Sequence, residues 1–184
     1  MSLQSWQETL TASYVDGPAL SSTAAASIIP TQNKITLPSG FWVLGKTIRI
    51  RGMARCSNIA TTPGTLTLDV RVAAVIAYTA TMQLSTTVHT TLPLAFELLL
   101  TCRAVGTGTS ANLMGSGTAT SQTLSLTAVA DSATTPATLL APNVTPVVGT
   151  GFDSTLANTL DMFGTFSLTG NGLTLQQYVV ESLN

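Results

Sequence analysis

The C-terminal stretch Thr159-Leu-Asp-Met-Phe-Gly-Thr-Phe-Ser-Leu168 alternates in polarity along its length. One face carries Leu160, Met162, Gly164, Phe166 and Leu168. A period of two is typical of a half-buried β-strand. Thr169-Gly-Asn-Gly172 follows, and Asn-Gly supplies the positive φ that a tight turn needs. We therefore predict a closing hairpin in which Leu173 to Leu183 pairs back on this strand, over a sheet formed by earlier residues.

Three earlier stretches show the same alternation. Thr47 to Ser57 places on one face Ile48, Ile50, Gly52, Ala54 and Cys56, and on the other Arg49, Arg51, Met53 and Arg55. In Thr65 to Val75, the inward positions are Leu66, Leu68, Val70 and Val72, and the outward positions include Asp69 and Arg71. In Leu94 to Ala104, the inward positions are Phe96, Leu98, Leu100 and Cys102, and the outward positions include Glu97 and Arg103. These are the central strands of the predicted sheets.

Weaker strand candidates complete the pattern. They are Ser27 to Ile29, Lys34 to Leu37, Ala77 to Gln83, Leu84 to Thr91, Asn112 to Thr118 and Thr120 to Ala128, followed by a long connection over Val129 to Thr150. No segment repeats apolar residues at the spacing of an amphipathic helix. Eight to ten short strands with long connections predict an all-β fold, an antiparallel double-sheet sandwich of the jelly-roll kind.

The 184 residues fit one jelly-roll domain over residues 28–184, preceded by residues 1–27 as an N-terminal arm or a first strand over Leu10 to Val15. Only 8% of residues are charged, against about 25% in an ordinary soluble domain. With a net charge of -1, no long-range field attracts nucleic acid or an anionic membrane, and little repulsion keeps copies apart. We expect a homo-oligomer, no secretory signal and no membrane helix.

Residues with reactive side chains are few and scattered. The only histidine, His89, has no nucleophile motif near it, and the acids occur singly along the chain. Cys56 and Cys102 lie in apolar alternations, which predicts buried free thiols rather than a disulfide or a metal site. We therefore predict no enzyme activity, no cofactor and no metal.

The candidate contact residues are three arginines, one acid and two large aromatic side chains. Arg49, Arg51 and Arg55 lack the aromatic platform of a nucleic-acid site, so a solvated face or a subunit contact is favoured. A hairpin between their strand and the next would bring Asp69 to them, and we predict ion pairs within or between subunits. Trp6 and Tyr14 are candidates for contacts made by the N-terminal segment.

Three segments carry a family resemblance: Ile35 to Trp42 with Gly45 to Arg51, Leu100 to Gly108, and Gly151 to Thr155 with Leu160 to Phe166 and Gln177 to Asn184. Together they resemble small virion proteins of tailed bacteriophages with a jelly-roll body, found among head decoration, cement or head-fibre components. The resemblance spans about residues 28–184 and carries over no catalytic or ligand residue.

The resemblance implies a structural virion protein on the capsid exterior, assembled in the bacterial cytoplasm. Its expected partners are the major capsid protein of the phage head and further copies of itself, and the resemblance favours a trimer. The alternative is a head-fibre or tail adhesin whose jelly roll binds a host receptor or glycan. A glycan site usually gathers aromatic residues, and Trp6, Trp42 and the tyrosines do not cluster in the sequence, which favours cement.

Overall fold

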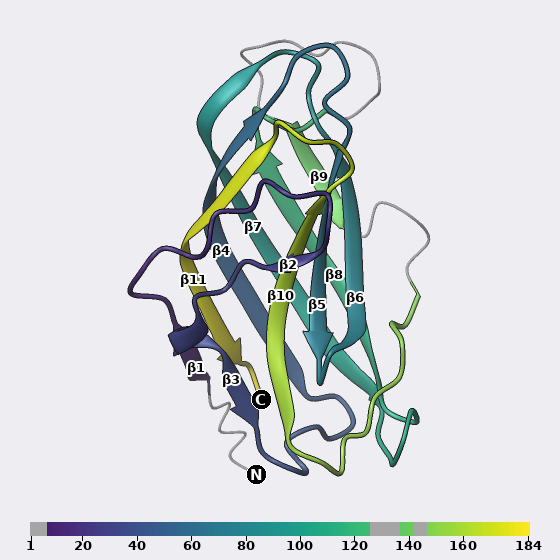
Figure 1. The fold of residues 1–184 in the computed structure, drawn as a ribbon. Helices are drawn as coiled ribbons and strands as arrows, with labels where there is room; N and C mark the ends of the chain where they lie inside the picture. Colours follow the sequence, from purple (N-terminus) through teal and green to yellow (C-terminus); the bar gives the residue numbers. More distant parts are fainter. Residues whose placement is uncertain (1–6, 126–136, 142–146) are drawn as a thin grey trace.

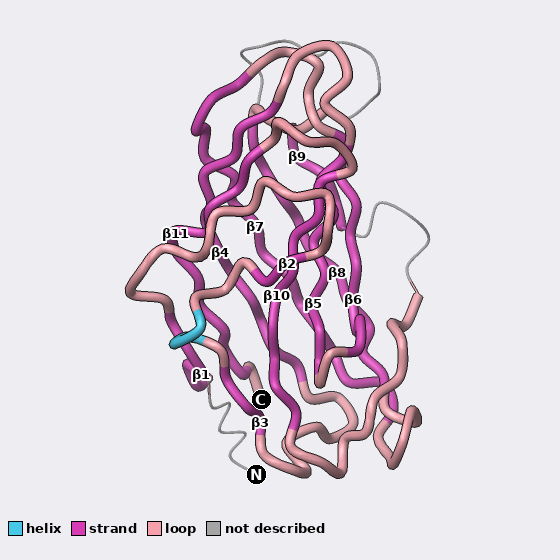
Figure 2. Tube along the Cα trace, viewed as in Figure 1, coloured by secondary structure: helices cyan, strands magenta, loops and turns pink. Residues whose placement is uncertain are grey.

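The computed structural model describes residues 7–125, 137–141 and 147–184. These residues form β-strands and one short 3-10 helix, which Figure 2 shows in cyan. The strands are β1 (Glu8–Ala12), β2 (Ala26–Ser27), β3 (Ile35–Leu37), β4 (Thr47–Asn58), β5 (Thr65–Val72), β6 (Val75–Gln83), β7 (His89–Ala104), β8 (Asn112–Ser121), β9 (Ala137–Ala141), β10 (Asn158–Phe166) and β11 (Gly172–Ser182).

The strands build two antiparallel sheets that lie one over the other (Figure 1). One sheet has six strands in the order β1-β11-β4-β7-β8-β9, and the other has the order β2-β10-β5-β6, with β3 also paired to β10. If β8 and β9 are set aside and β2 and β3 are counted as one strand, eight strands remain. Renumbered 1 to 8 in chain order, they follow the order 1-8-3-6 in one sheet and 2-7-4-5 in the other. This is the double Greek key of a jelly roll. The predicted all-β double-sheet sandwich is confirmed, with β8 and β9 as an added hairpin.

The core lies between the inner faces of the two sheets. The predicted inward residues of β4, β5, β7 and β10 are buried, except Gly52, which is half-buried. Asp69, predicted to point outward, is buried as well. Cys56 and Cys102 are buried free thiols, as predicted. Leu168, also predicted to face the core, lies beyond the end of β10 and is exposed.

The predicted closing hairpin is wrong, because β10 and β11 belong to different sheets. Met162 of β10 pairs with Val70 of β5, whereas Val180 of β11 pairs with Ile50 of β4. The turn between them crosses the sandwich. Its Asn171 side chain is buried, donates to the Pro63 carbonyl at 2.7 Å and accepts from the Ile59 amide at 3.1 Å. These bonds to a neighbouring loop, rather than cross-strand pairing, define the turn.

The predicted hairpin between β4 and β5 is also wrong, since β4 pairs with β7 and β11 in the opposite sheet. The tight hairpin joins β5 to β6, and its two turn residues, Ala73 and Ala74, have φ of 50° and 69°. Such angles normally call for Asn or Gly. The turn therefore left no signal in the sequence, and the predicted strand ran on to Val75.

Three weaker predictions also change. Leu84 to Thr91 is no strand of its own: Leu84 makes an isolated bridge to Leu124, and β7 already begins at His89. β8 runs continuously to Ser121, so the predicted break near residue 119 is absent; the far end of the second predicted strand, residues 126–128, lies outside the described residues. The long connection over 129–150 contains β9, which pairs with β8.

The described part of the N-terminal segment lies on the body. β1 pairs with β11 at the edge of the six-stranded sheet, and β2 pairs with β10 in the other sheet. Between them, Leu20 bridges to Leu173 and is buried. Trp6 lies outside the described residues.

Candidate functional site

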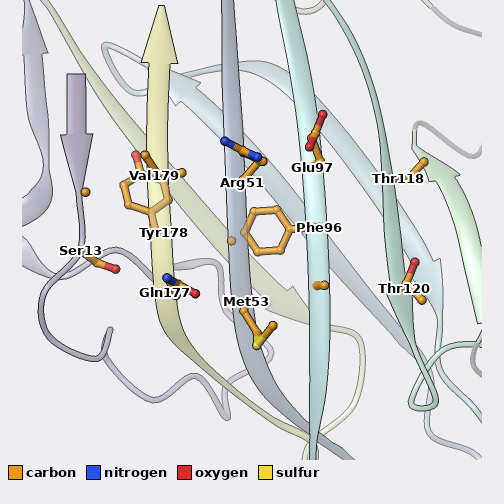
Figure 3. Close-up of a pocket in the computed structure, with 13 residues that line it drawn as sticks. Ser13, Arg51, Met53, Phe96, Glu97, Thr118, Thr120, Gln177, Tyr178 and Val179 are labelled. Carbon is orange, nitrogen blue, oxygen red and sulfur yellow. The ribbon is translucent and has the colours of Figure 1, made fainter. Parts of the chain in front are cut away.

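A hollow of about 660 Å³ lies on the outer face of the six-stranded sheet (Figure 3). The strand register builds it from two rows of side chains that cross the strands β11, β4, β7 and β8. One row is Gln177, Met53, Ala95 and Thr120, and the other is Val179, Arg51, Glu97 and Thr118. Ala12 and Ser13, at the end of β1, line its remaining side.

The hollow combines an apolar centre with a polar end. Ala95 has a small side chain, and Met53 beside it remains 43% exposed on a face where alternation predicts polar residues. A second hollow of about 440 Å³ shares Met53 and Ala95 and continues toward Pro93. At the polar end, Arg51 and Glu97 occupy paired positions on the neighbouring strands β4 and β7 (Figure 3). Among the described residues, Glu97 forms no ion pair.

Beside the hollow, two of the predicted arginines converge on one acid. Glu181 is only 7% exposed, and its Oε2 lies 2.8 Å from Arg49 and 3.0 Å from Arg51. Its Oε1 accepts from the Gln7 amide at 2.6 Å. Burial raises the pKa of Glu181, but the hydrogen bonds from Arg49, Gln7 and Arg51 and the charge of Arg49 outweigh it and hold the pKa below its ordinary value. The cluster joins the residue before β1 to β11 and β4.

Arg55, the third arginine on this face of β4, contacts the N-terminal segment instead. Arg55 lies 3.6 Å from Asp16, and both side chains are exposed. Tyr14, two residues earlier, is 75% exposed. These ion pairs could not be predicted from the sequence, because their members are far apart in the chain. Glu181 follows Arg49 by 132 residues, and Asp16 precedes Arg55 by 39.

The predicted ion pairs of Arg49, Arg51, Arg55 and Asp69 form within the chain, but with other partners. Within one chain Asp69 does not reach the three arginines, because β5 lies in the other sheet. Asp69 is buried and its carboxylate lies 3.4 Å from Arg71, two residues along the same strand face. The Arg71 guanidinium lies 3.8 Å from the ring centre of Phe163. Asp69 thus belongs to a separate cluster on the outer face of the five-stranded sheet.

We expect Asp69→Ala to lower the free energy of unfolding by about 1 to 2 kcal/mol, since Arg71 keeps its contact with Phe163 and reaches solvent. Asp16→Ala, which removes an exposed pair, is the control and should change the value by less than about 0.5 kcal/mol. Urea unfolding of the purified variants measures both. A loss as large as about 3 kcal/mol for Asp69→Ala would contradict the weak pairing that the single 3.4 Å contact implies.

Within the described residues, the chain offers little reactive chemistry. No group of three or more His, Cys, Asp or Glu side chains is placed to hold a metal ion. Burial raises the pKa of Cys56 to about 11, partly offset by a hydrogen bond with Thr123, so the thiol is protonated at neutral pH. No helix in the described part is long and apolar enough to cross a membrane.

Neither the protein-family models nor the curated proteins nor the solved structures that were compared with this chain match it. The site is therefore defined by its own residues. Sequence reasoning missed the hollow because the residues that line it run from 12 to 179. One signal was present: Met53 and Ala95 are apolar at outward positions of their strands.

Proposed function

We propose that this chain is a structural virion protein, a decoration or cement protein on the outside of a phage head. The observation that carries the proposal is the outer face of the six-stranded sheet. There an open hollow, an exposed tyrosine loop and the arginine cluster lie on neighbouring strands. An exposed surface with an apolar centre and charged residues at its rim is suited to contact with another protein.

The construction of the body supports a mechanical role. Strands from the start, middle and end of the chain alternate within each sheet, so that β1, β11 and β4 are neighbours. A local pull on one strand is therefore resisted by pairings distant in the sequence. When several such rigid bodies bind one lattice, individually weak contacts combine into lasting attachment. The partner in this role is the major capsid protein.

Removal of residues 1–6 tests whether Trp6 contributes to attachment. A larger truncation to residue 27 would delete β1 and β2 and damage both sheets. We expect the 1–6 truncation to keep the thermal unfolding transition of the full chain and to bind empty phage heads at least about tenfold more weakly, as for loss of one aromatic anchor. Normal head binding by the folded truncation would remove Trp6 from the mechanism.

Localisation on the particle tests the proposal itself. In cryo-electron microscopy of virions that contain this chain, we expect its density on the head exterior, bound to the major capsid protein. Heads assembled without it should release DNA at a lower temperature than complete heads. Density confined to tail fibres would contradict the cement role and support the alternative of an adhesin that binds a host receptor or glycan. Absence from the virion would overturn both.

A further inference from the structure

We propose that the hollow on the outer face of the six-stranded sheet receives Tyr14 from a second copy of this chain, so that copies join head to tail in a ring. The inference rests on the proposed function only in treating this face as a protein contact. It names the partner as the protein itself.

Tyr14 is presented on a loop that is already held in place. The amide of Ser13 donates to the Tyr178 carbonyl at 2.8 Å, and the amide of Gly17 donates to the Leu175 carbonyl at 2.7 Å. Gly17 is required at this close approach, because a Cβ there would lie 2.1 Å from the Ile28 carbonyl oxygen. The loop that follows β1 projects at the left of Figure 1. A loop fixed on both sides loses little conformational entropy when its tip is bound.

The tip of this loop has the composition of a contact residue. Tyr14 is 75% exposed and the neighbouring Val15 is also exposed. In solution, such a side chain leaves a large apolar ring in water, whereas in a contact it supplies both apolar area and a hydroxyl group. Asp16 pairs with Arg55 of β4, which keeps the base of the loop against the sheet.

The hollow matches a tyrosine in both chemistry and size. Met53 and Ala95 offer an apolar surface for the ring. At the polar end, the Glu97 carboxylate can accept the phenol hydroxyl, and the exposed guanidinium of Arg51 can lie against the ring face. The volume of about 660 Å³ falls in the range of about 300 to 1,000 Å³ typical of sites that enclose a ligand, so it has room for Tyr14 and Val15 together.

The loop and the hollow are different surface patches of one molecule. The hollow is lined on this side by Ala12 and Ser13, and Tyr14 is not among its lining residues. When the loop of each copy enters the hollow of the next copy without a return insertion, the contact is heterologous, and repeated copies close into a ring when the rotation allows it. The net charge of -1 leaves little repulsion against such a ring. The number of subunits, a trimer by the family resemblance, stays a prediction.

Two substitutions on opposite sides of the contact test it. Tyr14→Ser removes the inserted ring, and Ala95→Arg places a charged side chain in the hollow from an exposed position. Leu156→Ser is the matched control, since Leu156 is exposed on another loop and does not line the hollow. In sedimentation velocity at micromolar concentration, we expect rings for the wild type and the control. Each test variant should associate at least about tenfold more weakly and sediment near the 19.0 kDa monomer.

Mixing the two variants gives the decisive result. Tyr14→Ser keeps an intact hollow and Ala95→Arg keeps an intact loop, so an equimolar mixture retains one productive contact. We expect heterodimers and no ring. A reciprocal two-fold contact would also keep one insertion in the mixed pair, so the size of the wild-type assembly separates the two symmetries: a ring larger than a dimer supports the head-to-tail contact, and a wild-type dimer would overturn it. Circular dichroism of each variant, with the wild-type spectrum and a cooperative melting transition, shows that the variants are folded.

The opposite results are equally clear. A wild type that sediments as a monomer, a ring that persists in both folded variants, or a mixture without heterodimers would overturn the contact. A monomeric wild type that still decorates phage heads would overturn only this inference and leave the proposed function in place. A ring that dissociates in both variants but is absent from virions would support the contact and overturn the proposed function.

Discussion

Replacing Trp42 by Ala is expected to lower the free energy of unfolding by about 3 to 5 kcal/mol, the usual cost of deleting a buried tryptophan. Trp42 is only 2% exposed. Its ring meets Phe41 edge-on at 5.2 Å and Phe152 at 5.8 Å between ring centres. Phe152 is itself bonded through its backbone to Ala111, just before β8. The indole therefore links the connection before β4 to the segment that leads into β10.

The neighbouring position supplies the control for this change. Val43 is 55% exposed, and Val43→Ala should alter the free energy of unfolding by less than about 0.5 kcal/mol. Trp42→Phe should cost less than Trp42→Ala, because a ring remains and the buried Nε1, which has no hydrogen-bond partner among the described residues, is removed. Guanidinium unfolding measures all three. A loss below about 1 kcal/mol for Trp42→Ala would show that the indole does not anchor this end of the sandwich.

The direction in which strand residues point could be predicted from the sequence. In β4, Ile50 and Ala54 are buried while Arg51 and Arg55 are exposed, as alternation predicts. Burial on one face imposes this pattern whatever the neighbouring strand is. The same reasoning identified the closing strands and the buried thiols. These features depend only on polarity along a single strand.

Strand neighbours could not be predicted, because the alternation is identical for a hairpin and for a crossing between sheets. Asn171-Gly172 has the composition of a hairpin turn, yet buried hydrogen bonds of Asn171 turn it into a crossing. Conversely, the real hairpin uses Ala73 and Ala74, which carry no turn signal. In both places, tertiary contacts override the local preference.

The candidate site depends on these unpredictable neighbours. Once β11 lies beside β4, Glu181 faces Arg49, and once β7 lies on the other side, Glu97 faces Arg51. The prediction from the sequence paired β4 with β5 in a hairpin, and for that reason it placed Asp69 beside the arginines. The side-chain directions were predicted correctly, but the strand order was not. The arginines were therefore placed on the correct face and assigned the wrong acidic partner.

Glu181 provides the second large effect. We expect Glu181→Ala to lower the free energy of unfolding by about 3 kcal/mol, because it leaves Arg49 and Arg51 unpaired and adjacent. This loss is at the low end of the range for removing one partner of a buried ion pair, since the Arg51 side chain is partly exposed to solvent. The change also removes the bond to Gln7, so amide exchange in β1 should become faster. Arg103→Gln is the control, since Arg103 is exposed on β7 and does not line the hollow, and it should stay within about 0.5 kcal/mol.

The lowered pKa of Glu181 also predicts how stability depends on pH. A carboxyl whose pKa is lower in the folded than in the unfolded state stabilises fully above its ordinary value of 4.5, and this contribution is lost as pH falls below that value through the folded pKa. Wild type should therefore lose more stability on acidification than Glu181→Gln, which keeps the shape but has no proton to take up. The difference between their urea midpoints should be constant at neutral pH and shrink below pH 4.5. Parallel acid profiles for the two proteins would show that Arg49 and Arg51 do not stabilise the charge on Glu181.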